Sequence, residues 1–137
     1  LFRSVKGLDL SPFNAFAPPV LGIALDGFPH EVFSDDFEIL RFDFRQDNFP
    51  METKPLEVKV TRAGVCIGIA QWIKLKLDAE TSYENRPAKE AGYNGHWTHI
   101  LYRFPDALEV EPGDIIRLSA RHDRMHLSID FVEHVRG

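Results

Sequence analysis

The sequence of 137 residues is poor in cysteine and in long apolar runs. Its single cysteine, Cys66, excludes an intrachain disulfide and any zinc site that needs two or four cysteines. A lone thiol suits a reducing compartment, so we expect a cytoplasmic location. No apolar run approaches the ~20 residues of a membrane helix, and we therefore expect no membrane partner.

Basic charge is also scarce, because 16 lysine and arginine residues stand against 21 aspartate and glutamate residues, for a net charge of −5. Proteins that bind nucleic acid usually carry a basic excess, so we expect no nucleic-acid partner. The glycine patterns G-x-G-x-x-G and P-loop, which hold dinucleotides and phosphates, are missing. We therefore expect no cofactor in this chain.

No metal site or activated nucleophile is evident. His122 and His126 are four residues apart, a spacing that on a strand would separate them by roughly 13 Å, and if they flank a turn they sit at offset positions. The histidines are typical of surface and turn positions, and we expect no metal; they are His30, His96, His99, His122, His126 and His134. Cys66 lies in a strand between apolar neighbours, which indicates a buried small side chain rather than a reactive thiolate.

Carboxylates gather in two stretches of the sequence. The first holds Asp35, Asp36, Glu38 and Asp43, and the second holds Glu109, Glu111 and Asp114. Charged side chains at exposed sheet edges guard against aggregation, so we interpret both groups as solvated edges.

What the sequence does contain is an apolar fraction of 44%, which is enough for one buried core. Nine prolines and nine glycines are spread along the chain and punctuate short segments. This rhythm predicts an all-β fold, an antiparallel β-barrel or β-sandwich forming a single domain over 1–137. One short N-terminal helix is expected, with Ser11 as its cap, Pro12 at its first position and Phe13–Phe16 as its turn.

Two hairpins are predicted from alternating apolar residues. A two-residue turn at Asp123-Arg124 would give the pairs Ile116–Phe131, Leu118–Ile129, Ala120–Leu127 and His122–Met125. A turn at Ala63-Gly64 would give the pairs Val60–Ile67, Val58–Ile69 and Leu56–Gln71. In the second hairpin Ile67 and Ile69 would share one face, and Cys66, Gly68, Ala70 and Trp72 the other, with both faces covered.

Further strands are expected at Phe37–Phe44 and His99–Phe104. Pro112-Gly113-Asp114 is a turn signal between Val110 and Ile115. The stretch Thr81–Gly95 has little periodicity and is interpreted as a long loop, a type of segment that is often functional.

The segment Gly95–Pro105 ends this long loop and enters a strand. His96 and Trp97 would present an imidazole and an indole at the junction. An indole face attracts a guanidinium, and an imidazole exchanges a proton near neutral pH. The structural alternative is that Trp97 fills the end of the barrel and that His96 bonds a backbone carbonyl.

The order of the motifs resembles the C-terminal β-barrel domain of protein arginine methyltransferases, over nearly the full chain. Five segments carry the resemblance: Val5–Phe13 at the entry to the barrel, Phe37–Phe44 with its Phe-Asp pair, Gly68–Ile73 with its Trp, His96-Trp97 followed by Leu101-Tyr102 and Pro105, and the turn Val110–Ile116 with its Gly-Asp pair. His96-Trp97 matches the Thr-His-Trp loop of the family. The sequence departs from the family at Gly95, where the family usually has threonine.

The resemblance implies a substrate-side domain that helps to complete an arginine pocket. His96 would be a catalytic residue that orients the active site, and Trp97 a substrate-binding residue. S-adenosylmethionine would bind to an upstream methyltransferase domain of the parent protein, and the chain, which begins with Leu1, would be an excised piece of it. An arginine-containing protein would be the substrate, and a homodimer is also implied. The chain by itself would not be a catalyst.

Two other functions remain open at this stage. One is a non-catalytic β-sandwich that serves as a protein-interaction module. The other is a carbohydrate-binding sandwich that stacks sugars on Trp72, Trp97 and Tyr93, although the strand that carries Trp72 is expected to be buried.

Overall fold

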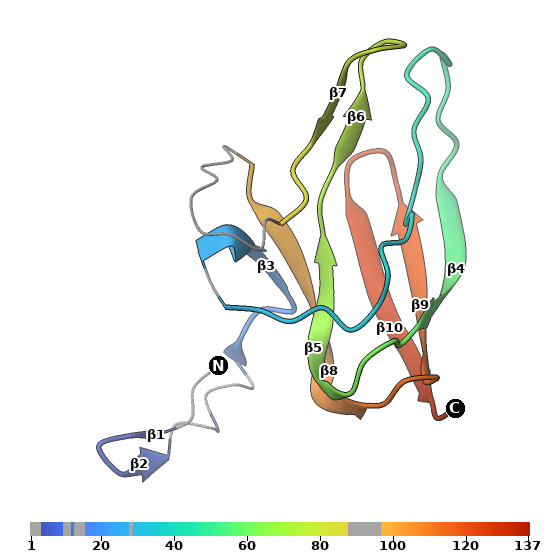
Figure 1. Ribbon diagram of the computed structural model, residues 1–137. Helices are drawn as coiled ribbons and strands as arrows, with labels where there is room; N and C mark the ends of the chain where they lie inside the picture. The colour runs from blue at the N-terminus through green and yellow to red at the C-terminus, as the bar shows by residue number, and fades with distance from the viewer. Residues whose placement is uncertain (1–3, 10–11, 13–15, 28, 88–96) are drawn as a thin grey trace.

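The computed structural model describes residues 4–9, 12, 16–27, 29–87 and 97–137, and it is built almost wholly of strands (Figure 1). The strands are β1 Ser4–Val5, β2 Leu8–Asp9, β3 Val20–Ile23, β4 Glu52–Lys59, β5 Gly64–Gln71, β6 Lys74–Lys76, β7 Ser82–Glu84, β8 His99–Val110, β9 Ile115–His122 and β10 Leu127–Val135, and a 3₁₀ helix, η2, covers Leu25–Gly27.

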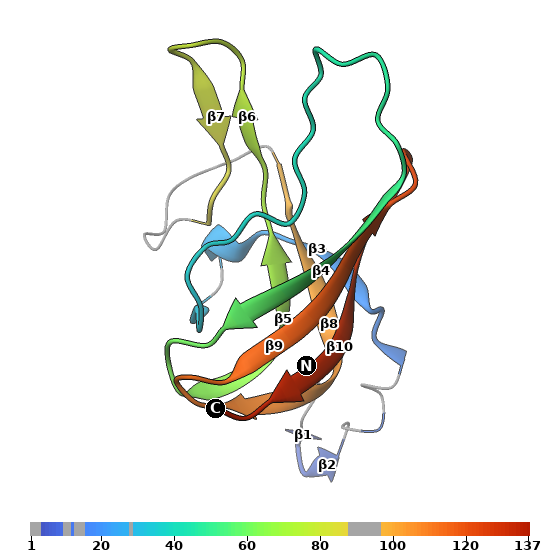
Figure 2. The same ribbon diagram turned by 90° about the vertical axis from the view of Figure 1, so that its right-hand side faces the viewer.

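Two three-stranded antiparallel sheets make up the body of the protein. One has the order β10–β9–β4 and the other the order β3–β8–β5 (Figure 2). The short hairpins β1–β2 and β6–β7 stand outside the two sheets. The prediction of an all-β antiparallel sandwich is confirmed, and within the described ranges the sheets do not join into a closed barrel. The predicted N-terminal helix depends on residues 11 and 13–15, which lie outside the described residues.

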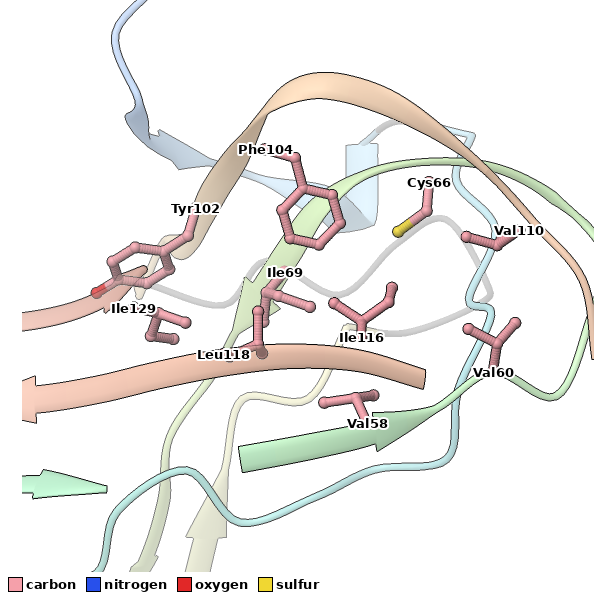
Figure 3. Close-up of a cluster of buried hydrophobic side chains, with 10 residues drawn as sticks. All are labelled: Val58, Val60, Cys66, Ile69, Tyr102, Phe104, Val110, Ile116, Leu118 and Ile129. Atoms are coloured by element: carbon pink, nitrogen blue, oxygen red, sulfur yellow. The ribbon is translucent and has the colours of Figure 1, made fainter. Parts of the chain in front are cut away.

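The core lies between these two sheets (Figure 3). One side comes from β4, β9 and β10, and the other from β5 and β8. The buried members are Val58, Val60, Cys66, Ile69, Tyr102, Phe104, Val110, Ile116, Leu118 and Ile129. Along β9 the buried residues Ile116, Leu118 and Ala120 alternate with exposed or half-buried ones, as a strand with one covered face requires.

The C-terminal hairpin is present, but its predicted register is wrong by one pair. His122 pairs with Leu127, Ala120 with Ile129 and Leu118 with Phe131. The turn has four residues, because the Asp123 carboxylate accepts hydrogen bonds from the backbone N–H groups of Met125 and His126. A shift of two residues keeps every side chain on its face, so the apolar pattern does not distinguish the two registers.

The predicted hairpin at Ala63-Gly64 is wrong, because β4 and β5 belong to different sheets. The chain stays with the first sheet as far as Val60, whose N–H donates to the Asp114 carbonyl at 2.8 Å and whose carbonyl accepts from Gly113 N–H at 3.0 Å. It then crosses to the second sheet. Gly64 lies against the Phe33 ring, where a Cβ would fall 2.3 Å from the nearest ring atom.

A bulge in β8 alters the faces expected for β5. Cys66 pairs with Leu108 and Gly68 with Arg103, so residues 104–107 stand opposite Ile67 alone. Pro105 lies in this bulge, where its lack of a backbone N–H leaves no ladder hydrogen bond unmade. Strand β8 can therefore continue past Phe104, the end that the sequence predicted. Because the phase changes here, Cys66 and Ile69 are both buried while Ile67 is exposed, contrary to the predicted grouping of Ile67 with Ile69. Gly68 approaches β8 closely, and an added Cβ would lie 2.2 Å from the Tyr102 carbonyl oxygen.

The predicted strand at Phe37–Phe44 is also absent from the described residues, where this stretch has no ladder partner. Its alternation has another cause. Phe37 and Ile39 pack against the core, whereas the rings of Phe42 and Phe44 gather with Phe49 at centroid distances of 5.7–6.5 Å.

The turn between β8 and β9 is fastened by Asp114, as the sequence signal predicts for residues 112–114. Its buried carboxylate accepts from the N–H groups of Gly137 and Glu111, and from the side chains of His134 and Arg136. These partners, led by the Gly137 N–H, lower the pKa of Asp114 to about 2. The C-terminal residues are thereby tied to the turn that joins the central strands of both sheets.

None of the helices that the structure describes has the length and apolar character needed to cross a bilayer.

Candidate functional site

A pocket of about 410 Å³ opens beside the ends of β5 and β7 and the start of β8. Both tryptophans of the chain line it, Trp72 from the β5–β6 connection and Trp97 from the residues just before β8. The other lining residues are Gln71, Ile73, Asn85, Thr98 and Ile100. Trp97 is 54% exposed, and its ring lies 6.3 Å from the Tyr83 ring. The pocket therefore offers solvent-facing aromatic surface beside polar side chains.

Asn85 holds the wall of the pocket together from a buried position. Its side-chain oxygen accepts from Ile73 N–H at 2.7 Å, and its backbone N–H donates to the Ile73 carbonyl at 3.1 Å. Its side-chain amide also donates to the Trp97 carbonyl at 3.5 Å. The segment that leads into β8 is thus linked through Asn85 to the β5–β6 connection. This link fixes the spacing of the two tryptophans.

His99 continues this linkage into the core. The imidazole is 2% exposed, and its Nδ1 accepts from Leu25 N–H at 3.2 Å. Since Nδ1 is the acceptor, the ring proton lies on Nε2, which donates to the Asn85 carbonyl at 2.8 Å. His99 therefore connects η2, β8 and the residue after β7, and it serves as a structural residue rather than the surface histidine that the sequence suggested.

Charged groups surround the outer face of Trp72. The indole N–H donates to the Glu84 carboxylate at 3.3 Å, and Lys74 lies 3.4 Å from the same carboxylate. The Arg86 guanidinium stands over the Trp72 ring at 5.9 Å from its centroid. It also donates two hydrogen bonds to Asp36, at 2.6 and 3.1 Å, and this contact raises the pKa of Arg86. Asp36 was predicted to sit on a solvated edge, and here it pairs across the fold with a residue 50 positions away.

The two residues predicted from sequence as site residues have different outcomes. Trp97 lies at the pocket with more than half of its surface exposed, so it does not fill the end of the sandwich. His96 lies outside the described residues, as do Gly95 and Tyr93. Trp72 was expected to be buried, but it is half-buried and lines the pocket, because β5 ends at Gln71 and the backbone leaves the sheet there.

The described histidines do not gather around a common point. His134 bonds Asp114, His126 lies beside Asp123 in the exposed turn, and the buried ring of His122 packs on Phe42 at 4.8 Å. No cluster of three metal-ligating side chains occurs in ranges 4–9, 12, 16–27, 29–87 and 97–137. The interpretation of Cys66 as a buried apolar side chain is confirmed, and burial raises the pKa of its thiol.

Sequence reasoning missed the residues that assemble the site around the tryptophans. Asn85, Arg86 and Glu84 lie in or next to the stretch interpreted as a loop, of which Ser82–Glu84 is strand β7. Tyr83 faces Leu75 in this hairpin, so the short alternation Ser-Tyr-Glu was the available signal. The Arg86–Asp36 pair could not be predicted from a local sequence pattern, because the two residues are remote in sequence.

Comparison with known proteins bears on what this site serves. The chain is similar to part of the protein arginine N-methyltransferase 9 of Mus musculus. The sequences are 27% identical over 125 residues, which cover 90% of this chain and 14% of that protein. Protein arginine N-methyltransferase 9 of Homo sapiens gives the same identity and coverage. The chain therefore spans about 14% of the length of the curated relatives it matches.

No family model matches the chain. The similarity nevertheless agrees with the order of motifs noted in the sequence, and it relates the chain to a region of a protein arginine methyltransferase.

Proposed function

We propose that this chain is the substrate-side domain of a protein arginine methyltransferase-like enzyme, in which Trp97 forms part of the arginine pocket. The observation that carries the proposal is the exposure of Trp97 at the rim of a pocket that a second indole also lines. The similarity to protein arginine N-methyltransferase 9 along 90% of the chain supports it. The net charge of −5 suits a basic, arginine-rich protein substrate.

The chemistry asked of this domain is positioning. A guanidinium within about 6 Å of an indole face is attracted by the ring quadrupole. In the proposal Trp97 supplies that face, and His96 next to it orients the groups that act on the guanidinium. Holding a substrate nitrogen in line with a methyl donor lowers the barrier mainly through orientation.

The methyl donor implied by the resemblance is S-adenosylmethionine, which methyltransferases of this kind bind at a glycine-rich turn between a strand and a helix. The described residues contain no such turn, because β3 leads only into the short 3₁₀ helix η2 and no strand there leads into an α-helix. The part of the chain that the structure describes therefore does not fit the cofactor, and we assign its binding to an upstream domain of the parent protein. On this proposal the chain by itself transfers no methyl group. The cytoplasmic location and the homodimer belong to the same proposal.

The test is a pair of substitutions in the complete enzyme. Trp97→Ala removes the indole face, and a cation–π contact of about 0.5–2 kcal/mol corresponds to a rise in KM for an arginine peptide of about 2- to 30-fold. Phe44→Ala removes an exposed aromatic ring that does not line the pocket, and this control should leave KM unchanged. Labelled methyl transfer measures both. Unchanged kinetics for Trp97→Ala would contradict the proposal.

The second candidate function is a non-catalytic protein-interaction module. One observation favours it, the group of aromatic rings formed by the exposed Phe42 and Phe44 with the half-buried Phe49. If this function is the true one, Phe44→Ala weakens partner binding while Trp97→Ala has no effect, which is the reverse of the pattern above.

A further inference from the structure

The Arg86 guanidinium contacts two side chains that come from parts of the chain far apart in sequence. Asp36 comes from the segment before β4, and Trp72 from the β5–β6 connection. Both guanidinium nitrogens that face Asp36 donate to its two carboxylate oxygens, the paired geometry that a planar guanidinium favours. The ring of Trp72 covers the face of the same group at 5.9 Å.

The recognising groups are held by contacts of their own. Glu84 accepts from the Trp72 indole N–H, which fixes the ring, and Lys74 pairs with Glu84. Lys74 and Glu84 are in turn paired across the β6–β7 ladder. The Trp72 ring is therefore held in place without help from Arg86. A guanidinium that binds to it loses little free energy to ordering the ring.

Other arginine–carboxylate pairs lack this combination, including that of Arg117, which bonds Glu57 and Glu133 on the neighbouring strands. Arg41 and Arg45 bond carboxylates three and two residues away, Glu38 and Asp43. These are local pairs, and neither guanidinium stands over an aromatic ring in the described part of the chain. Arg86 alone among them combines a carboxylate from a remote segment with an aromatic face.

We propose that Asp36 and Trp72 form a guanidinium-binding site that Arg86 fills as an internal ligand, and that an arginine side chain of a bound protein takes this site when Arg86 leaves it. The ligand class is a peptide arginine. The identity of the bound protein as an arginine-rich substrate rests on the proposed function, which this second arginine site would deepen. Trp72 and Trp97 line the same pocket, but the contact proposed here is made with the Trp72 ring and Asp36, whereas the proposed function uses the Trp97 ring.

Arg86 competes with any external arginine. A group tethered in the same chain acts at an effective concentration of the order of mM. A single exposed ion pair with one aromatic contact binds weakly, so an external arginine gains access only when Arg86 is displaced or removed. Removal of Arg86 is therefore expected to raise the apparent affinity for an arginine probe by about 10-fold or more.

The experiment uses the full chain with Trp97→Phe, which leaves Trp72 as its single tryptophan. N-acetylarginine amide is titrated into this protein and into the same protein carrying Arg86→Ala, at constant ionic strength, while Trp72 emission is recorded. We expect a saturable change at least about 10-fold more sensitive to the probe in the Arg86→Ala protein. N-acetyllysine amide, which lacks the planar fork, should give a weaker response.

Two further variants make the outcome decisive. Asp36→Asn added to Arg86→Ala should abolish the response, and Arg41→Ala, the matched loss of an arginine from a local pair, should not create one. Arg86→Gln serves as a second way to empty the site, with circular dichroism confirming the fold of each variant. Equal, weak responses with and without Arg86 in both emptied variants would overturn the proposal.

The two proposals fail independently. The titration involves no methyl transfer and is made with Trp97 replaced, so its failure leaves the role of Trp97 untouched. Loss of the Trp97 effect on KM would likewise leave the arginine titration at Trp72 standing.

Discussion

Replacing His99 by alanine is the sharpest test of how the pocket is attached to the core. The imidazole is 2% exposed and satisfies two backbone groups, Leu25 N–H and the Asn85 carbonyl. Leu25 and Asn85 are themselves buried, so water does not readily replace the lost partner. An unsatisfied buried group costs about 1–3 kcal/mol, which gives about 2–6 kcal/mol for the two.

This loss is large against the total stability of a domain, which is typically about 5–15 kcal/mol. Urea unfolding followed by circular dichroism measures the free energy of unfolding through its midpoint and slope. His126→Ala is the matched control, because its side chain is 81% exposed in the β9–β10 turn and its removal should change stability by less than about 0.5 kcal/mol.

In His99→Ala the loss of structure should begin at the pocket. Since His99 bonds the residue that holds the Trp97 carbonyl, the Trp97 environment should loosen before the core unfolds. Tryptophan emission is expected to shift at lower urea than the circular dichroism signal in His99→Ala, and at the same urea in the wild-type protein. A His99→Ala protein as stable as His126→Ala would refute the view that His99 is a buried link.

Two other outcomes follow from the geometry. Gly68→Ala should destabilise the protein by at least about 1–3 kcal/mol, because its Cβ would strike the Tyr102 carbonyl oxygen. Gly22→Ala, also in a strand paired with β8, would place its Cβ at an ordinary contact distance of 3.8 Å from the Thr98 hydroxyl, and it should change stability by less than about 1 kcal/mol in the same urea titration. Asp114 has a pKa of about 2 in the folded protein against an ordinary 3.8, so its stabilising effect is complete above pH 4 and is lost as the pH falls toward 2. Thermal melts across this range should show a smaller acid-induced loss of Tm in Asp114→Asn than in wild type, and parallel curves would contradict the assignment.

The all-β class and the C-terminal hairpin were predictable because they depend on local alternation and turn residues. Leu118 and Ile129 carry a pattern that any antiparallel pairing with the same faces satisfies, so the pattern predicts the face and leaves a shift of two residues undecided. The exact turn depended on the Asp123 carboxylate, whose hydrogen bonds are invisible in an apolar pattern.

The errors share a cause, which is that partners remote in sequence override local signals. Ala63-Gly64 has the composition of a turn, but Val60 is held by Asp114 and Gly113 and the chain crosses between sheets instead. Phe37–Phe44 alternates like a strand, although no strand within residues 4–9, 12, 16–27, 29–87 and 97–137 pairs with it. The position of Trp97 at a pocket followed from its motif, whereas the surroundings of Trp72 depend on Asp36 and Arg86, which no spacing rule connects.

The pairing order of the sheets has a consequence for synthesis and folding. The central strands are β8 and β9, joined by the short turn that Asp114 fastens, and three of their four outer partners, β3, β4 and β5, come earlier in the chain. As the polypeptide leaves the ribosome, these three strands therefore remain without their sheet partners until residues 99–122 emerge, whereas the local hairpins β1–β2 and β6–β7 can pair beforehand. Pairing between such distant segments makes folding slow. Until it occurs, the unpaired strand edges can pair with other chains and promote aggregation. Pro55 in β4, an outer strand, interrupts one such edge and so protects it during that interval.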